Sequence, residues 1–132
     1  MKNVVDVSAW MEYFSDGPNA YYFAPAIEDI DRLIVPAVTL YGVVDEILGG
    51  PGEADALEAA AVMQQGRIVP LDAPLALTAA KLRRDHRLTS TGSITLATAE
   101  AHHAMLWTQD ERLAGVKGVR YVRERRTARG RR

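Results

Sequence analysis

Asp6 and Asp110 are the two residues of this sequence that are best placed for chemistry. Asp6 interrupts the short apolar run NVVDV at residues 3–7, and Asp110 follows the run AMLWTQ at residues 104–109. Short apolar runs of this kind are typical of buried parallel strands, so we expect each aspartate at the carboxyl end of a strand. Ligands of parallel α/β sheets bind beyond these ends. The two carboxylates are therefore predicted to meet in one cleft.

Two carboxylates in one cleft favour a site for a hard divalent cation such as Mg²⁺ or Mn²⁺. A cation held in this way activates water and stabilises the charge on a phosphodiester. Ser8 and Thr108 flank the aspartates and are predicted to form hydrogen bonds with a carboxylate or with a metal-bound water. The alternative is that each aspartate only caps the helical turn that follows it. For either residue alone that alternative is favoured, whereas the pair at equivalent strand ends favours a function.

Strand-like and helix-like segments alternate along the whole chain. The strand-like segments are residues 3–7, 33–38, 67–71, 104–109 and 119–122. Apolar residues at helical spacing predict helices over residues 9–14, 20–30, 39–48, 54–66, 72–88 and 91–103, the first of them capped by Ser8. This alternation predicts an α/β fold with one parallel sheet covered by helices on both faces. A length of 132 residues fits a single domain.

The charge is distributed unevenly, although the formal net charge is only -1. Residues 117–132 hold eight of the 16 lysines and arginines but one of the 17 acids, so this end is basic and the rest is acidic. Such a tail either neutralises the phosphates of a nucleic acid or is simply solvated. The chain has no cysteine, which excludes disulfides and thiolate zinc sites and fits a reducing cytoplasm. No segment predicts secretion or a membrane partner, so we expect a cytoplasmic protein.

Three segments together resemble a known family. They are VVDVSAWMEYF at residues 4–14, VPAVTLYGVVDEIL at residues 35–48 and STGSITLATAEAHHAMLWTQDERL at residues 90–113. Their order and spacing resemble a PIN domain, and specifically a VapC-type toxin of a bacterial toxin–antitoxin pair. The resemblance implies a three-layer PIN-like fold, with a short parallel sheet flanked by helices. It places the PIN domain at residues 1–123 and leaves residues 124–132 as a basic tail.

The resemblance implies a metal-dependent endoribonuclease, in which clustered acids bind Mg²⁺ or Mn²⁺ and RNA is cleaved. Two of these acids carry over to Asp6 and Asp110, as catalytic and metal-binding residues. The acid of a V-T-L-x-E pattern falls on Gly42, and the acid of an A-D-S-I-x-L-A-T-A pattern falls on Gly92. Half of the expected carboxylates are therefore missing. We expect a weakened affinity for the metal and a ribonuclease activity that is impaired or lost.

Gly42 is not explained by helix stability. A glycine inside a helix costs about 1 kcal/mol relative to alanine, and Gly42 lies well inside TLYGVVDEIL. Gly92 has the simpler explanation that it opens its helix. Glu46 lies one helical turn after Gly42 on the same helix face, so we expect it to act as a partial substitute ligand, with Asp45 as a second candidate.

The resemblance also implies partners. These are a VapB-type antitoxin, bound along the aromatic helices near the N-terminus, an RNA substrate, and a second copy of the chain in a homodimer. A different class of function stays open beside the disabled nuclease. In that alternative the chain is a non-catalytic PIN module that binds an antitoxin or RNA.

Overall fold

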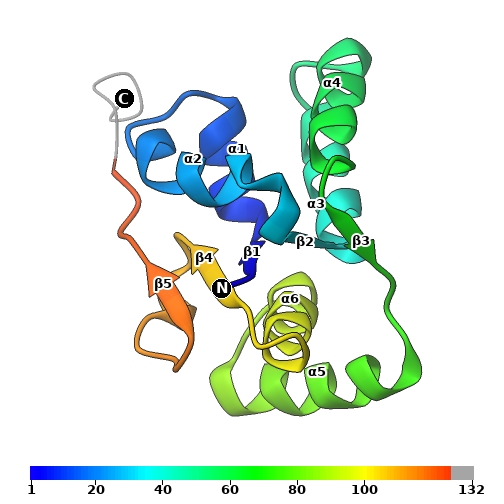
Figure 1. Ribbon diagram of the computed structural model, residues 1–132, viewed down its shortest axis with the longest axis vertical. Helices are drawn as coiled ribbons and strands as arrows, with labels where there is room; N and C mark the ends of the chain where they lie inside the picture. Colours follow the sequence, from blue (N-terminus) through cyan, green and yellow to red (C-terminus); the bar gives the residue numbers. More distant parts are fainter. Residues whose placement is uncertain (126–132) are drawn as a thin grey trace.

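A parallel sheet of five strands forms the centre of the protein (Figure 1). The computed structural model describes residues 1–125. The strands are β1 (Asn3–Val5), β2 (Leu33–Pro36), β3 (Arg67–Val69), β4 (Met105–Thr108) and β5 (Val119–Tyr121). They lie in the order β3-β2-β1-β4-β5, and every neighbouring pair is parallel. The predicted α/β fold with a parallel sheet is confirmed.

The order of the strands reverses at β1, which is the first strand along the chain and the central strand of the sheet. From there the chain builds outward to β2 and β3 on one side, and then to β4 and β5 on the other. Loops that leave neighbouring strands in opposite directions open a crevice at the carboxyl ends of those strands. Val5 pairs with Trp107, so β1 and β4 end at nearly the same level beside this crevice.

Helices cover both faces of the sheet (Figure 1). The helices on one face are α1 (Val7–Phe14), α2 (Ala20–Glu28), α3 (Ala37–Leu48) and α4 (Glu53–Met63), and those on the other are α5 (Ala73–His86) and α6 (Ser90–Ala101). Val5 and Val35 pack toward the first group, whereas Val4 and Ile34 pack toward the second. Successive side chains of a strand point to opposite faces, so a strand covered on both faces must be continuously apolar. Within residues 1–125, no helix is both long enough and apolar enough to cross a membrane.

The ends of several elements differ from the sequence-based expectation, and β1 and β3 are each two residues shorter than predicted. The helix α1 is capped by Asp6 and not by Ser8, because Asp6 Oδ1 accepts a hydrogen bond of 3.2 Å from the backbone N–H of Ala9. Aspartate and serine cap helices about equally well, so the pattern could not decide between them. The helix α3 begins directly after Pro36, which makes β2 two residues shorter than predicted.

The aromatic residues near the N-terminus divide between the core and the surface. Trp10 and Phe23 are fully buried, and the ring of Trp10 stacks on Phe14 at 5.5 Å between centroids. Tyr21, in contrast, is 71% exposed. Most of this aromatic cluster therefore stabilises the packing of α1 and α2 on the sheet, and only part of it is available to a partner.

Candidate active site

Asp6 is a buried carboxylate whose two oxygen atoms both accept hydrogen bonds. Oδ1 accepts a bond of 2.6 Å from the hydroxyl of Ser8, and Oδ2 accepts one of 2.5 Å from the hydroxyl of Thr108. The same Oδ1 atom also caps α1 through Ala9. The predicted contacts of Ser8 and Thr108 with a carboxylate are confirmed. Asp6 is thus fixed by groups from both β4 and α1.

Asp110 lies two residues beyond the end of β4 and starts the short 3₁₀ helix η2 (Glu111–Leu113). Its Oδ1 atom accepts a hydrogen bond of 3.0 Å from the backbone N–H of Arg112. Its own backbone N–H donates to the hydroxyl of Thr108 at 2.9 Å. Both aspartates therefore act as caps, which was the alternative reading of each. They are also linked to one another through Thr108.

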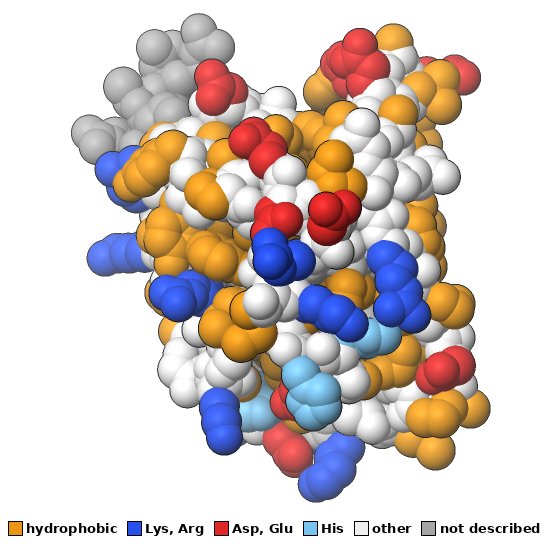
Figure 2. All heavy atoms as spheres, viewed as in Figure 1, with side chains coloured by type: hydrophobic (Ala, Val, Ile, Leu, Met, Phe, Trp, Pro, Cys, Tyr) orange, Lys and Arg blue, Asp and Glu red, His pale blue; other side chains and the backbone are white. Residues whose placement is uncertain are grey.

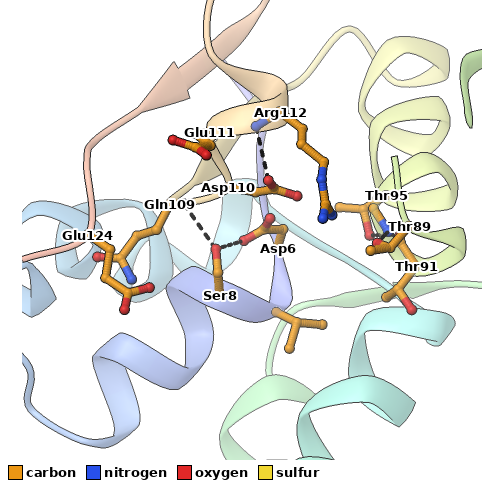
Figure 3. Close-up of a pocket in the computed structure, with 12 residues that line it drawn as sticks. Asp6, Ser8, Thr89, Thr91, Thr95, Gln109, Asp110, Glu111, Arg112 and Glu124 are labelled. Carbon is orange, nitrogen blue, oxygen red and sulfur yellow. Dashed lines mark hydrogen bonds between the residues drawn. The ribbon is translucent and has the colours of Figure 1, made fainter. Parts of the chain in front are cut away.

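The two aspartates line one cavity of about 410 Å³ at the carboxyl ends of the strands (Figure 3). The N-terminal part of α6 and its N-cap form another wall, where Thr89, Thr91 and Thr95 line the cavity. The prediction that Asp6 and Asp110 lie in one cleft is confirmed. Two elements that are about 100 residues apart in the sequence thus bring their acids to the same space.

Both glycines that stand at expected acid positions adjoin this cavity. Gly92 lines it directly, as the third residue of α6, and its N–H donates a hydrogen bond of 3.0 Å to the capping hydroxyl of Thr89. Gly42 lies behind the cavity wall. A Cβ atom at position 42 would be 2.9 Å from Cγ2 of Val7 and 3.6 Å from Cγ2 of Thr91, and both of these residues line the cavity.

Known proteins resemble this chain in sequence and in fold. The sequence matches the PIN domain family over residues 4–119, which is most of the chain. The chain belongs to the PIN domain family. A search of the curated proteins found no match to it.

The fold of this PIN domain is also that of several solved structures. A toxin–antitoxin complex from Klebsiella pneumoniae gives a TM-score of 0.76 at 20% identity, over 90% of this chain and 96% of that chain. PAE2754 from Pyrobaculum aerophilum gives 0.68 at 23% identity, over 92% and 91%. VapC20 from Mycobacterium tuberculosis, described as a sarcin–ricin loop cleaving toxin, gives 0.68 at 17% identity, over 83% and 91%. At these identities the likeness shows the fold alone.

Glu46 lies outside the cavity of this PIN domain. It is exposed on α3, as is Asp45, and neither residue is among those that line the cavity. The structure thus brings Asp6, Asp110 and the two glycine positions together but leaves Glu46 apart from them. Its part as a substitute ligand stays a prediction.

Three charged residues of the cavity were not expected from the sequence. Glu111 and Arg112 reach it because η2 follows Asp110, and Glu124 reaches it because the chain continues past the carboxyl end of β5 (Figure 3). The strand-end rule that indicated Asp110 could have indicated Glu124 if it had been applied to β5. No local pattern predicts that Arg112 faces the cavity.

The segment that carries Glu124 is bound to the loop before α2. Asn19, which is 1% exposed, donates hydrogen bonds of 2.7 Å to Gln109 Oε1 and 2.9 Å to the carbonyl of Arg123. Nε of Arg125 donates a hydrogen bond of 3.0 Å to Oδ1 of Asn19. The predicted start of the tail at residue 124 stays a prediction, but Glu124 and Arg125 contact the PIN domain. Residues 126–132 of that tail lie outside the described residues.

Burial raises the pKa of Asp6 above its usual value. The hydrogen bonds from Ser8, Thr108 and Ala9 stabilise the charged form and partly offset this effect, whereas the charge of Asp110 raises the pKa further. The carboxyl of Asp6 is therefore harder to ionise in the folded chain than in the unfolded one. The negative charge of Asp110 thus adds to the cost of ionising Asp6.

The oxygen atoms available as metal ligands in the cavity do not fit the divalent cation that the family resemblance implies. Both oxygens of Asp6 are already engaged by hydroxyl and N–H donors, and Oδ1 of Asp110 is engaged by Arg112. Positions 42 and 92 supply no ligand atoms from side chains. In the described part of the chain, no group of three or more His, Asp or Glu residues is arranged to hold a metal ion. Mg²⁺ usually binds through one or two carboxylates together with waters, and here both carboxylates at the family's acid positions already accept hydrogen bonds.

Proposed function

We propose that this chain is a VapC-type toxin whose metal-dependent endoribonuclease centre is impaired. One observation carries the proposal: Asp6 and Asp110 converge on a cavity that Gly92 lines, and Gly42 lies directly behind Val7 and Thr91 of its wall. In a nuclease of this family such a cavity is the place where carboxylates would gather around a cation. The PIN fold and its likeness to solved toxins support the lineage.

Impairment follows from the charge and the hydrogen bonds of the cavity. Metal-assisted cleavage of a phosphodiester needs a cation to activate water and to neutralise the charge that develops on the phosphate. With two aspartates that are engaged in caps, this chain would hold Mg²⁺ or Mn²⁺ weakly. The proposed activity on RNA is therefore far below that of a centre with all four acids.

An apolar groove supports the second part of the proposal, which is an antitoxin partner. A cavity of about 300 Å³ lies between α1 and α4 and is lined by Met11, Phe14 and Ala59 among other apolar side chains. Asp55 and Glu58 stand at its rim, and acidic side chains are seen over α4 in Figure 2. An amphipathic peptide with basic residues beside its apolar face would fit this groove. A homodimer is proposed with it, from the family resemblance alone.

The alternative is a non-catalytic PIN module that binds an antitoxin or RNA. The poor fit of the donor set to a cation favours this alternative. The two proposals differ in what happens when the missing acids are restored. A disabled nuclease would regain RNA cleavage, whereas a binding module would still cleave no RNA.

The test is RNA cleavage and toxicity of a restored variant that carries Gly42→Glu and Gly92→Asp. It also carries Val7→Ala, because Cγ2 of Val7 lies 2.9 Å from where the new Cβ of residue 42 must stand. We expect cleavage that needs Mg²⁺ or Mn²⁺ and that is lost again when Asp110→Asn is added. A folded restored variant that binds Mn²⁺ but cleaves no RNA would favour the binding module.

A further inference from the structure

We propose that Val7 and Arg112 hold the cavity in a metal-free form, Val7 by filling the space beside Gly42 and Arg112 by supplying the positive charge that a metal would bring. This inference rests on the proposed function and extends it. The residues that keep a cation out are then as important as the carboxylates that are missing. Both residues line the cavity, as do Asp6 and Asp110.

Val7 blocks the position from which a carboxylate of α3 would reach the cavity. Its Cγ2 atom lies 2.9 Å from the place of a Cβ atom on Gly42, closer than real Cβ contacts. Valine is branched at Cβ and has a restricted χ1, so it yields less readily than a long flexible side chain. A glutamate placed at position 42 would therefore meet Val7 first, at a typical overpacking cost of about 1–3 kcal/mol.

Arg112 is the cation of the cavity. The other charged residues that line it are the four carboxylates of Asp6, Asp110, Glu111 and Glu124. In the stretch from residue 1 to 125, Arg112 forms no ion pair that would hold its guanidinium elsewhere. Its backbone is fixed instead, through the bond of its N–H to Asp110.

The side chain of Arg112 reaches from η2 across the cavity, past the carboxylate of Asp110, toward Thr89 and Thr95 of α6 (Figure 3). The first turn of α6 between those threonines is where Gly92 lines the cavity. A glycine presents no side chain there, so the guanidinium has room at the place where an aspartate would otherwise bind a cation.

The charges make the guanidinium and a divalent cation compete for the cavity. The positive charge of Arg112 opposes the negative charge of the carboxylates that line the same cavity, and it would repel a divalent cation there. Restoring the two acids alone would therefore leave the cavity a poor metal site. Replacing Val7 and Arg112 as well would raise the affinity of the cavity for the cation.

The experiment is calorimetric titration of Mn²⁺ into three folded variants. The first variant carries Gly42→Glu and Gly92→Asp. The second adds Val7→Ala to these two substitutions, and the third adds Arg112→Gln to all three. We expect Mn²⁺ affinity to rise at each step, with Arg112→Gln alone contributing about tenfold, which is about 1.4 kcal/mol. Equal affinities in the first and third variants would overturn the proposal.

A matched control separates this effect from a general loss of positive charge. Arg67→Gln removes an exposed arginine at the start of β3, at the amino end of the sheet. We expect it to leave Mn²⁺ affinity unchanged in the same background, and an increase equal to that of Arg112→Gln would also overturn the proposal. Mn²⁺ binding without RNA cleavage in the third variant would sustain this inference while contradicting the proposed nuclease lineage.

Discussion

The hydroxyl of Thr108 joins Asp6 to Asp110, donating a hydrogen bond of 2.5 Å to Asp6 Oδ2 and accepting one of 2.9 Å from the backbone N–H of Asp110. Thr108 is itself fully buried at the end of β4. A single side chain therefore connects the ends of the two central strands.

Replacing Thr108 by valine should destabilise the protein. The substitution keeps the shape but leaves a buried carboxylate oxygen of Asp6 without its donor, at a cost of about 1–3 kcal/mol. Urea unfolding of the purified variant measures the loss. Thr98→Val is the control, because Thr98 donates only to the carbonyl of Ile94 inside α6. An equal loss in both variants would contradict a special role for the link between the strands.

The raised pKa of Asp6 makes a prediction about pH. Below the ordinary value of 3.8, Asp6 is protonated in both the folded and the unfolded state and costs nothing. As pH rises from there through the folded-state pKa, the unfolded chain ionises more readily, so the stability of the fold falls. Asn at position 6 keeps a capping oxygen and removes this penalty.

Asp6→Asn should therefore be more stable than the natural chain near neutral pH, with an advantage that shrinks as pH falls. Unfolding by urea between about pH 4 and pH 8 measures the difference. An advantage that is the same at every pH, or a loss of stability near neutral pH, would show that the carboxyl is not held at a raised pKa.

The fold and part of the cavity could be predicted from the sequence because they depend on local patterns. Apolar runs gave the strands, and the aspartates that follow two of those runs were expected in one cleft. The contributions of Arg112 and Glu124 could not be predicted in the same way. They depend on where η2 points and on how the segment after β5 packs against Asn19, and both are long-range contacts.

Asn19→Ala should loosen the segment that carries Glu124. The change removes the donor to Gln109 and to the carbonyl of Arg123, and unpaired buried groups of this kind cost about 1–3 kcal/mol. We expect faster hydrogen exchange at residues 122–125 together with lower stability. Arg125→Ala, which removes only the outer contact, should give a smaller change in both measurements. If exchange at residues 122–125 is unaffected by Asn19→Ala, the anchoring role is wrong.

Charge reversal at the rim of the groove should weaken antitoxin binding. Asp55→Lys and Glu58→Lys together change the sign of the rim without touching the apolar floor, and about a tenfold loss of affinity for a basic amphipathic peptide is expected. Fluorescence anisotropy with the cognate antitoxin peptide measures this change in affinity. Glu100→Lys, an exposed position that does not line this groove, is the control and should bind as the natural chain does.

The most direct test of the central claim is RNA cleavage by the natural chain in the presence of Mg²⁺ or Mn²⁺. Asp110→Asn serves as the matched variant, because it keeps the capping oxygen at η2 while it removes one of the two carboxylates. We expect the two proteins to cleave RNA equally poorly, with or without a chelator. Cleavage by the natural chain that a chelator abolishes, and that Asp110→Asn lacks, would contradict it.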